Sequence, residues 1–133
     1  MTLSAMSYYF TKETALGYEQ ALSKVQEELK KEGFGIITEI DVRDTLKKKL
    51  NVDFRKYKIL GACNPSFAHQ ALQAESRIGT MLPCNVIVQE RADGHIEVSA
   101  INPVESMKSV ANPQLEQLGN QVAAKLKAVV DRI

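Results

Sequence analysis

The sequence predicts an α+β fold, a two-layer sandwich in which two long helices cover one face of a five-stranded, mainly antiparallel sheet. Two observations predict it. Two segments show long helical stripes of apolar residues, and five short β-prone segments are bounded by turn residues. The segments follow one another in the order β-α-β-(α)-β-(α)-β-β-α, and the length of 133 residues predicts a single domain over 1–133.

The first half of the chain gives three strands. The aromatic segment 7–11 predicts the first strand, and Thr14 is expected to cap a helix with the apolar stripe Tyr18, Leu22, Val25 and Leu29. Gly33 should end this helix in a left-handed conformation. Residues 34–40 predict the second strand, with Ile36, Thr38 and Ile40 on one face, and residues 55–63 predict the third.

Shorter helices are expected between the strands. Asp41 should cap a short helix with its apolar residues pointing inward, namely Val42, Leu46 and Leu50. Pro65 and Ser66 should open another helix, whose buried side is predicted to be Phe67, Ala71 and Leu72.

The second half of the chain gives two strands and the last helix. Residues 84–90 and 95–101 predict the fourth and fifth strands, and Asp93-Gly94 is a hairpin signal between them. Asn112-Pro113 should begin the last helix, which has the stripe Leu115, Leu118, Val122, Leu126, Val129 and Ile133.

Composition excludes several classes of protein. Apolar residues at 44% and charged residues at 25% are typical of soluble globular domains. With a net charge of +1, the lysine run 47–49 is interpreted as a solvated helix face, and no nucleic-acid partner is predicted. No apolar run has the length of a membrane span and no signal-peptide pattern is present, so we expect a cytoplasmic protein with reduced thiols.

Both cysteines fall at one predicted rim of the sheet. Cys63 ends the third strand and Cys84 begins the fourth, so antiparallel pairing of these strands would bring the two thiols close together. His69, one turn into the covering helix, is a candidate base. The predicted ligand-binding or thiol site comprises Cys63, Asn64, His69, Pro83, Cys84 and Asn85.

The chemistry of this rim stays open. The two thiols can be inert core residues, since unpaired cysteine packs as a small hydrophobe. One of them can instead be a reactive or ligand-contacting thiol, or the two can form a disulfide. The spacing C-x5-H-x14-C matches no standard zinc pattern, so neither a metal nor a cofactor is predicted. The sequence has no phosphate-binding glycine loop and no nucleophile elbow, which favours a protein that is not an enzyme.

Four segments, in order, resemble the domain of unknown function family 302: GFGIITEIDV, YKILGACNPSFAHQAL, GTMLPCNVIVQE and DGHIEV. The resemblance implies a TATA-binding-protein-like fold of β-α-β4-α order with a curved sheet, usually dimeric. It implies no activity, because the family is named for having none assigned.

Three functions are therefore predicted as alternatives. The first is a homodimeric binding module that takes a small molecule or a partner at the cysteine rim. The second is a thiol-based redox or sulfur-transfer protein that uses Cys63 and Cys84 with His69. The third is a purely structural dimerisation module, because a two-layer domain leaves the second sheet face uncovered, with Tyr9, Ile37 and Ile87 on it.

Overall fold

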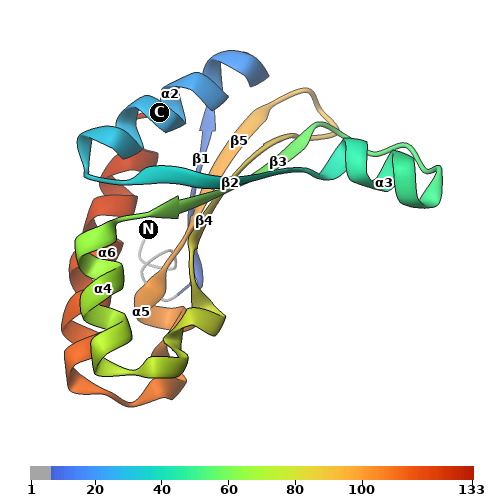
Figure 1. Cartoon of the computed structure of the whole chain (residues 1–133). Helices are drawn as coiled ribbons and strands as arrows, with labels where there is room; N and C mark the ends of the chain where they lie inside the picture. Colours follow the sequence, from blue (N-terminus) through green and yellow to red (C-terminus); the bar gives the residue numbers. More distant parts are fainter. Residues whose placement is uncertain (1–6) are drawn as a thin grey trace.

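The computed structural model describes residues 7–133, and its five strands form one sheet in the order β1-β5-β4-β3-β2. All neighbouring strands are antiparallel: β1 (Tyr9–Thr14), β2 (Gly35–Asp41), β3 (Tyr57–Cys63), β4 (Cys84–Glu90) and β5 (Ile96–Ile101). The helices are α2 (Tyr18–Lys31), α3 (Val42–Leu50), α4 (Pro65–Ala74), α5 (Pro103–Ser106) and α6 (Pro113–Asp131), with short 3₁₀ segments η1 (Ser76–Met81) and η2 (Lys108–Val110). The predicted α+β fold and element order are confirmed (Figure 1).

The main core lies between one face of the sheet and the helices α2 and α6 (Figure 1). Strand alternation sends the apolar residues of β4 and β5 to this face, where Val86 pairs with Ala100 and Val88 with Val98. All four are buried, as are Val25 and Leu29 of α2 and Leu126 and Val129 of α6. Burial of each such side chain contributes about 1.5–3 kcal/mol, so this face holds the two layers together.

A smaller apolar cluster lies beyond the rim of the sheet. It joins α4, η1 and the start of α6 through the buried residues Ala71, Ile78 and Leu115. Figure 1 shows α4 beside α6, in the region that the chain enters after leaving β3. A small cavity lies between this cluster and the main core.

A buried carboxylate links α2 to the C-terminal end of α6. Glu28 accepts hydrogen bonds from Lys31 at 2.8 Å and from Arg132 at 2.6 Å, and it forms an ion pair with Lys24 at 3.0 Å. These bonds, led by that of Lys31, lower the pKa of Glu28 to about 2. The carboxylate therefore stays charged at neutral pH, and its bond to Arg132 connects α2 to the end of α6.

The prediction that helix α3 points its apolar residues inward is wrong, because none of its residues is buried. Asp41 does cap it, accepting from the N–H of Asp44 at 2.9 Å. However, Val42 and Leu46 are only half-buried, and Leu50 is 66% exposed. Figure 1 shows the reason: α3 stands at the far end of the β2–β3 pair, away from the layer formed by α2 and α6, so its apolar side has no layer to pack against.

Strand β2 corrects the predicted alternation. Ile36 pairs with Ala62, but Thr38 pairs with Gly61, so Ile37 is an extra residue in a β-bulge. The bulge reverses the faces: Ile36 packs against the main core, whereas Thr38 lies on the opposite, open face. The prediction that these two residues share a face is therefore wrong.

Two further predictions fail locally. Thr14 does not cap α2 but ends β1, which pairs with β5 over its whole length, and the cap position is Gly17. Leu72 is 44% exposed, because α4 buries only Ala71 against the small cluster. Gly33, with φ of +87°, and the Asn112 cap of α6 are confirmed.

Candidate functional site

The two cysteines lie at neighbouring strand ends, as predicted, but not at equivalent positions. Cys84 pairs with Ala62, and both side chains face the helices, where Cys84 is 9% exposed. Cys63 is the next residue after Ala62, so its side chain starts from the opposite face of the sheet and is half-buried. Both thiols are free, and no disulfide joins them.

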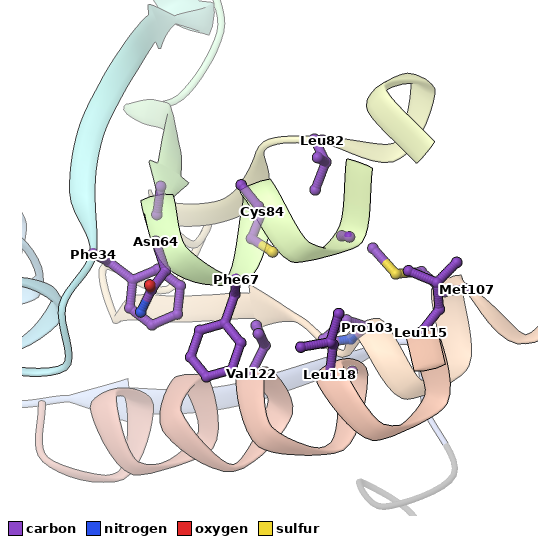
Figure 2. A pocket seen from close by; sticks show the side chains of 14 residues that line it. Phe34, Asn64, Phe67, Leu82, Cys84, Pro103, Met107, Leu115, Leu118 and Val122 are labelled. Carbon is purple, nitrogen blue, oxygen red and sulfur yellow. The ribbon is translucent and has the colours of Figure 1, made fainter. Parts of the chain in front are cut away.

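Cys84 lines a small cavity between the sheet rim and the helices α4, α5 and α6. Figure 2 shows its sulfur among apolar side chains. The cavity has a volume of about 50 Å³, and its walls include Phe34, Phe67, Leu82, Met107, Leu118 and Val122. Asn64 is its only wall residue with a polar side chain other than the thiol. A space this small and apolar resembles a packing gap more than a ligand site, which typically has about 300–1,000 Å³.

Burial sets the chemistry of this thiol. It raises the pKa of Cys84 to about 11, with a smaller contribution from the nearby Cys63. The thiol is therefore protonated at neutral pH, whereas a nucleophilic cysteine must be a thiolate. This argues against Cys84 as a reactive residue.

His69 is not placed to act as a base for Cys84. It is exposed on α4, while Phe67, Ala68 and Ala71 of the same helix line the cavity. Among residues 7–133, no hydrogen bond engages the His69 side chain. Cys84 and His69 therefore do not form a thiol–imidazole pair.

Asn64 has a structural contact. Its side-chain amide donates to the main-chain oxygen of Glu32 at 3.3 Å, directly before the left-handed Gly33. A Cβ on Gly33 would lie 3.1 Å from the Asn64 nitrogen, so the turn and the amide fit closely together. Asn64 thus joins the end of α2 to the start of α4.

Pro83 and Asn85 belong to the open face of the sheet. Asn85 pairs with Gly61 and is exposed. The ring of Pro83 packs over Gly61, where an added Cβ would lie only 2.8 Å from the Pro83 Cγ. The six predicted residues are thus divided: Cys84 and Asn64 meet at the cavity, whereas Pro83 and Asn85 lie on the other side of the sheet.

A larger hollow, of about 420 Å³, lies on that open face. Strand register arranges its residues in rows across β1, β5, β4 and β3. One row contains Glu97, Gln89 and Tyr57, and the next contains Thr11, Ser99 and Ile87. Beyond these rows lie Asn85 and the pair Tyr9 and Ile101. We call this space the sheet hollow; it also includes Tyr8 and Arg91.

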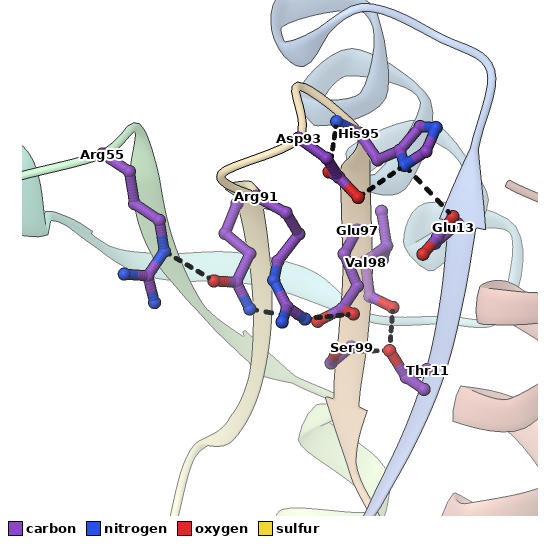
Figure 3. A network of polar contacts seen from close by, with 10 residues as sticks. Thr11, Glu13, Arg55, Arg91, Asp93, His95, Glu97, Val98 and Ser99 are labelled. Carbon is purple, nitrogen blue, oxygen red and sulfur yellow. Dashed lines mark hydrogen bonds and ion pairs between the residues drawn. The ribbon is translucent and has the colours of Figure 1, made fainter.

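Polar side chains at one end of the sheet hollow form a relay (Figure 3). Arg55 Nε donates to Gln89 Oε1 at 2.9 Å, and Gln89 Nε2 donates to Glu97 Oε1 at 3.0 Å. Arg91 Nη1 completes it with a 2.9 Å bond to Glu97 Oε2. Gln89 is buried and Glu97 is largely so, and each gives one exposed arginine a hydrogen-bond partner of settled position.

The opposite end of the sheet hollow is aromatic. The rings of Tyr8 and Tyr9 form an edge-to-face pair with centroids 4.9 Å apart. Between the two ends, the hydroxyls of Thr11 and Ser99 share a 2.8 Å hydrogen bond. The hollow therefore combines apolar surface with a few fixed polar groups, a combination typical of small-molecule sites.

Sequence reasoning missed most of the sheet hollow. Of its residues, only Asn85 was a predicted site residue. Tyr9 and Ile87 were expected only to lie on the open sheet face, against a partner subunit. A signal did exist in the alternation of β5, where Glu97 and Ser99 occupy the polar face. What the sequence does not reveal is that Arg55, 34 residues before Gln89, reaches the same row.

Two further features of the described residues bear on function. Within residues 7–133, no three side chains of histidine, cysteine, aspartate or glutamate come together in a way that would hold a metal ion. In the same part of the chain, no helix has both the length and the apolar character needed to cross a membrane.

Comparisons with known proteins identify the family. The family model "Domain of unknown function DUF302" matches residues 10–133, and the chain belongs to this family. The structure is similar to the crystal structure of an uncharacterized conserved DUF302 protein from Bacillus stearothermophilus, with a TM-score of 0.88 and 27% identity. That match covers 94% of this chain and 97% of the other.

A curated relative is an uncharacterized protein from Aquifex aeolicus, 26% identical over 74 residues. The match covers 53% of this chain and 51% of the relative, so it spans about half the length of each protein. The resemblance found in the sequence is confirmed, and none of these relatives has a described activity.

Proposed function

We propose that this domain is a small-molecule-binding module without catalysis of its own, and that its ligand occupies the sheet hollow. The observation that supports this most strongly is the hollow itself. Its volume of about 420 Å³ is within the range of ligand pockets, and fixed polar groups lie beside tyrosine and isoleucine side chains. By contrast, the cavity at Cys84 has about 50 Å³.

The polar floor of the sheet hollow supports the proposal further. Gln89 and Ser99 are buried although they lie on the sheet face that no helix within residues 7–133 covers. Their hydrogen-bonding groups are engaged by neighbouring side chains, which keeps the floor rigid. A binding site on a rigid sheet requires little ordering when a ligand arrives, and this limits the entropic cost of binding.

The test is a titration of the ¹⁵N-labelled full chain with three naphthalene probes: 2-naphthoate, naphthalene-2-carboxamide and 2-naphthylmethylammonium. We expect at least one probe to shift the amide signals of residues 85–89 and 97–101 selectively. The variant Ile87→Glu should abolish these shifts, whereas Ile37→Glu, at an exposed residue outside the hollow, should retain them. If no probe shifts these amides, or if Ile87→Glu has no effect, the sheet hollow is not a binding site.

We also propose that the protein is a homodimer in the cytoplasm. Several exposed apolar side chains lie along β2 and beyond it at the end of α3: Ile37, Ile40, Leu50 and Val52. Such a group on a small domain favours a partner surface, and two free thiols favour a reducing compartment. Sedimentation equilibrium should give twice the single-chain mass, and Leu50→Glu should shift the protein toward monomer. A single-chain mass at all concentrations would contradict the dimer.

The cysteine rim stays a separate prediction. If Cys63 and Cys84 contact a ligand, the double substitution by alanine should weaken probe binding while the domain still folds. Unchanged binding by this variant would remove the rim from consideration and leave the sheet hollow as the candidate site.

A further inference from the structure

The two ends of the sheet hollow differ in charge and in shape. At one end Arg91 lines the hollow beside the Gln89–Glu97 pair, and Arg55, which does not line the hollow, is bonded to Gln89 at its edge. The other end holds the rings of Tyr8 and Tyr9. A molecule lying along the hollow would therefore meet guanidinium groups at one end and aromatic surface at the other. This polarity limits the class of ligand that fits.

The guanidinium groups have donors to spare. Arg55 uses its Nε for Gln89, and Arg91 uses one Nη for Glu97. No other side-chain hydrogen bond from these two groups reaches any residue from 7 to 133. A guanidinium group has five N–H donors, so each group keeps several for an incoming acceptor. Each guanidinium group is already held by one hydrogen bond, which reduces the side-chain entropy lost on binding.

The local charge favours an anion with a single negative charge. Arg91 and Glu97 line the hollow and balance each other, and Arg55 at its edge adds one positive charge, which leaves +1 at this end. Glu13 lies opposite Glu97 in the strand register, but its carboxylate is turned to His95, 3.7 Å from the ring nitrogen (Figure 3). A carboxylate matches this excess better than a phosphate dianion does, and it accepts paired N–H donors from arginine.

Aromatic surface runs from the charged end along the hollow. The Arg55 guanidinium lies 4.5 Å from the centroid of the Phe54 ring and 5.4 Å from that of Tyr57. Tyr57 lines the hollow, and Ile87 lies in the next row of side chains. A flat ring has a surface to stack on directly beside the cationic groups.

We propose that the sheet hollow binds an aromatic carboxylate, with the carboxylate at Arg55 and Arg91 and the ring over Tyr57 and Ile87, toward Tyr9. This inference rests on the proposed function, since it names the ligand class of the same site. It assigns Arg55 and Arg91 as specificity-determining residues, and Gln89 and Glu97 as positioning residues that act through them.

The experiment compares affinities within the same probe set. By calorimetry and amide shifts, 2-naphthoate should bind at least about tenfold more tightly than naphthalene-2-carboxamide, a difference of about 1.4 kcal/mol. Arg91→Gln and Arg55→Gln should each remove most of this preference while leaving carboxamide binding unchanged. Arg91→Lys should retain part of it, because it keeps the charge but not the paired donors. The control is Arg77→Gln, since Arg77 is an exposed arginine on η1 outside the hollow.

The outcomes separate this inference from the proposed function. Equal binding of 2-naphthoate and the carboxamide in the hollow would overturn the carboxylate assignment but keep the binding module. Tighter binding of 2-naphthylmethylammonium would overturn it as well. If the hollow amides of ligand-free protein shift with protein concentration and no probe competes, the occupant is a second copy of the chain, and both proposals fail.

Discussion

The cavity and the sheet hollow are lined by consecutive residues of one strand. Cys84, the first residue of β4, faces the helices and borders a space of about 50 Å³, while Asn85 faces the other way and borders one of about 420 Å³. The cavity is walled almost wholly by apolar side chains, whereas the hollow contains a hydrogen-bonded relay of arginine, glutamine and glutamate.

This difference shows how a two-layer fold separates packing from recognition. On the covered face, a polar group without a partner costs free energy, so side chains are apolar and the gaps between them are small. On the open face, polar side chains can be kept because water or neighbouring side chains satisfy them. The cysteine pair in the sequence is divided between the two faces: Cys84 is buried beneath the helices, and Cys63 is half-buried.

Two glycines give the sharpest test, and the largest effect is expected on the open face. An added Cβ on Gly61 would meet the Pro83 ring at 2.8 Å and the Thr38 hydroxyl even more closely. We expect Gly61→Ala to lower the free energy of unfolding by about 2–3 kcal/mol, because the Pro83 ring, directly before β4, cannot easily move. The measurement is urea denaturation. Gly35→Ala is the matched control, since nothing lies within 4 Å of a Cβ there. Equal stability of the two variants would contradict the close packing of Gly61.

The covered face should respond to alkaline pH through Cys84. Its thiol has a pKa of about 11 when folded but about 9.0 as a free group, so the unfolded state loses the proton first as the pH rises. The free energy of unfolding should therefore fall by about 2 kcal/mol between pH 9 and 11 in the wild type relative to Cys84→Ala. Denaturant titrations across this range measure the difference. A pH slope unchanged by Cys84→Ala would show that the thiol is not buried.

A smaller, stabilising effect is expected where the cavity has room. Gly119 of α6 lines the cavity, and an added Cβ would make ordinary contacts with the main chain of Pro103 at 3.8–3.9 Å. Gly119→Ala should raise the free energy of unfolding by about 1 kcal/mol, because alanine favours the helix. Thermal unfolding measures the gain. Gly94→Ala, at a turn residue with φ of +86°, should instead lose stability, and a loss in both variants would show that the cavity is already full.

Thiol labelling should distinguish the two cysteines without changing stability. With iodoacetamide at pH 8, Cys84 should react at least about a hundredfold more slowly than an ordinary thiol. Its pKa is raised from 9.0 to about 11, and this lowers the fraction present as thiolate by about the same factor. Cys63, which is half-buried, should react faster. Peptide mass spectrometry at successive times gives both rates. Faster reaction at Cys84 than at Cys63 would revive the thiol-chemistry hypothesis.

Local sequence rules succeeded where one segment carries the whole signal. The stripe of α6, the left-handed Gly33 and the capping residues Asp41 and Asn112 all depend on neighbours within a few positions. The same rules failed at α3, whose amphipathic pattern predicted an inward face. An apolar stripe says that a helix has one face to bury, but not that another layer is within reach.

Long-range register explains why the candidate site was only partly foreseen. The sequence placed Cys63 and Cys84 at one rim, and the pairing of β3 with β4 confirms that their strand ends are neighbours. The offset of one residue, with Cys84 opposite Ala62, put the thiols on different faces. Side chains alternate along a strand, so a single-residue offset is enough to divide a predicted site.

By itself, the sequence of this protein determined its elements, their order and its family, because these depend on local periodicity, on caps and turns, and on short motifs in a fixed order. Only the tertiary structure decided which residues share a space. It paired Arg55 with Gln89 across 34 positions, turned Ile36 and Thr38 to opposite faces through a bulge, and enclosed Cys84 beneath helices from the far end of the chain. Such contacts depend on strand register and layer packing, which join residues distant in the sequence and have no local signature.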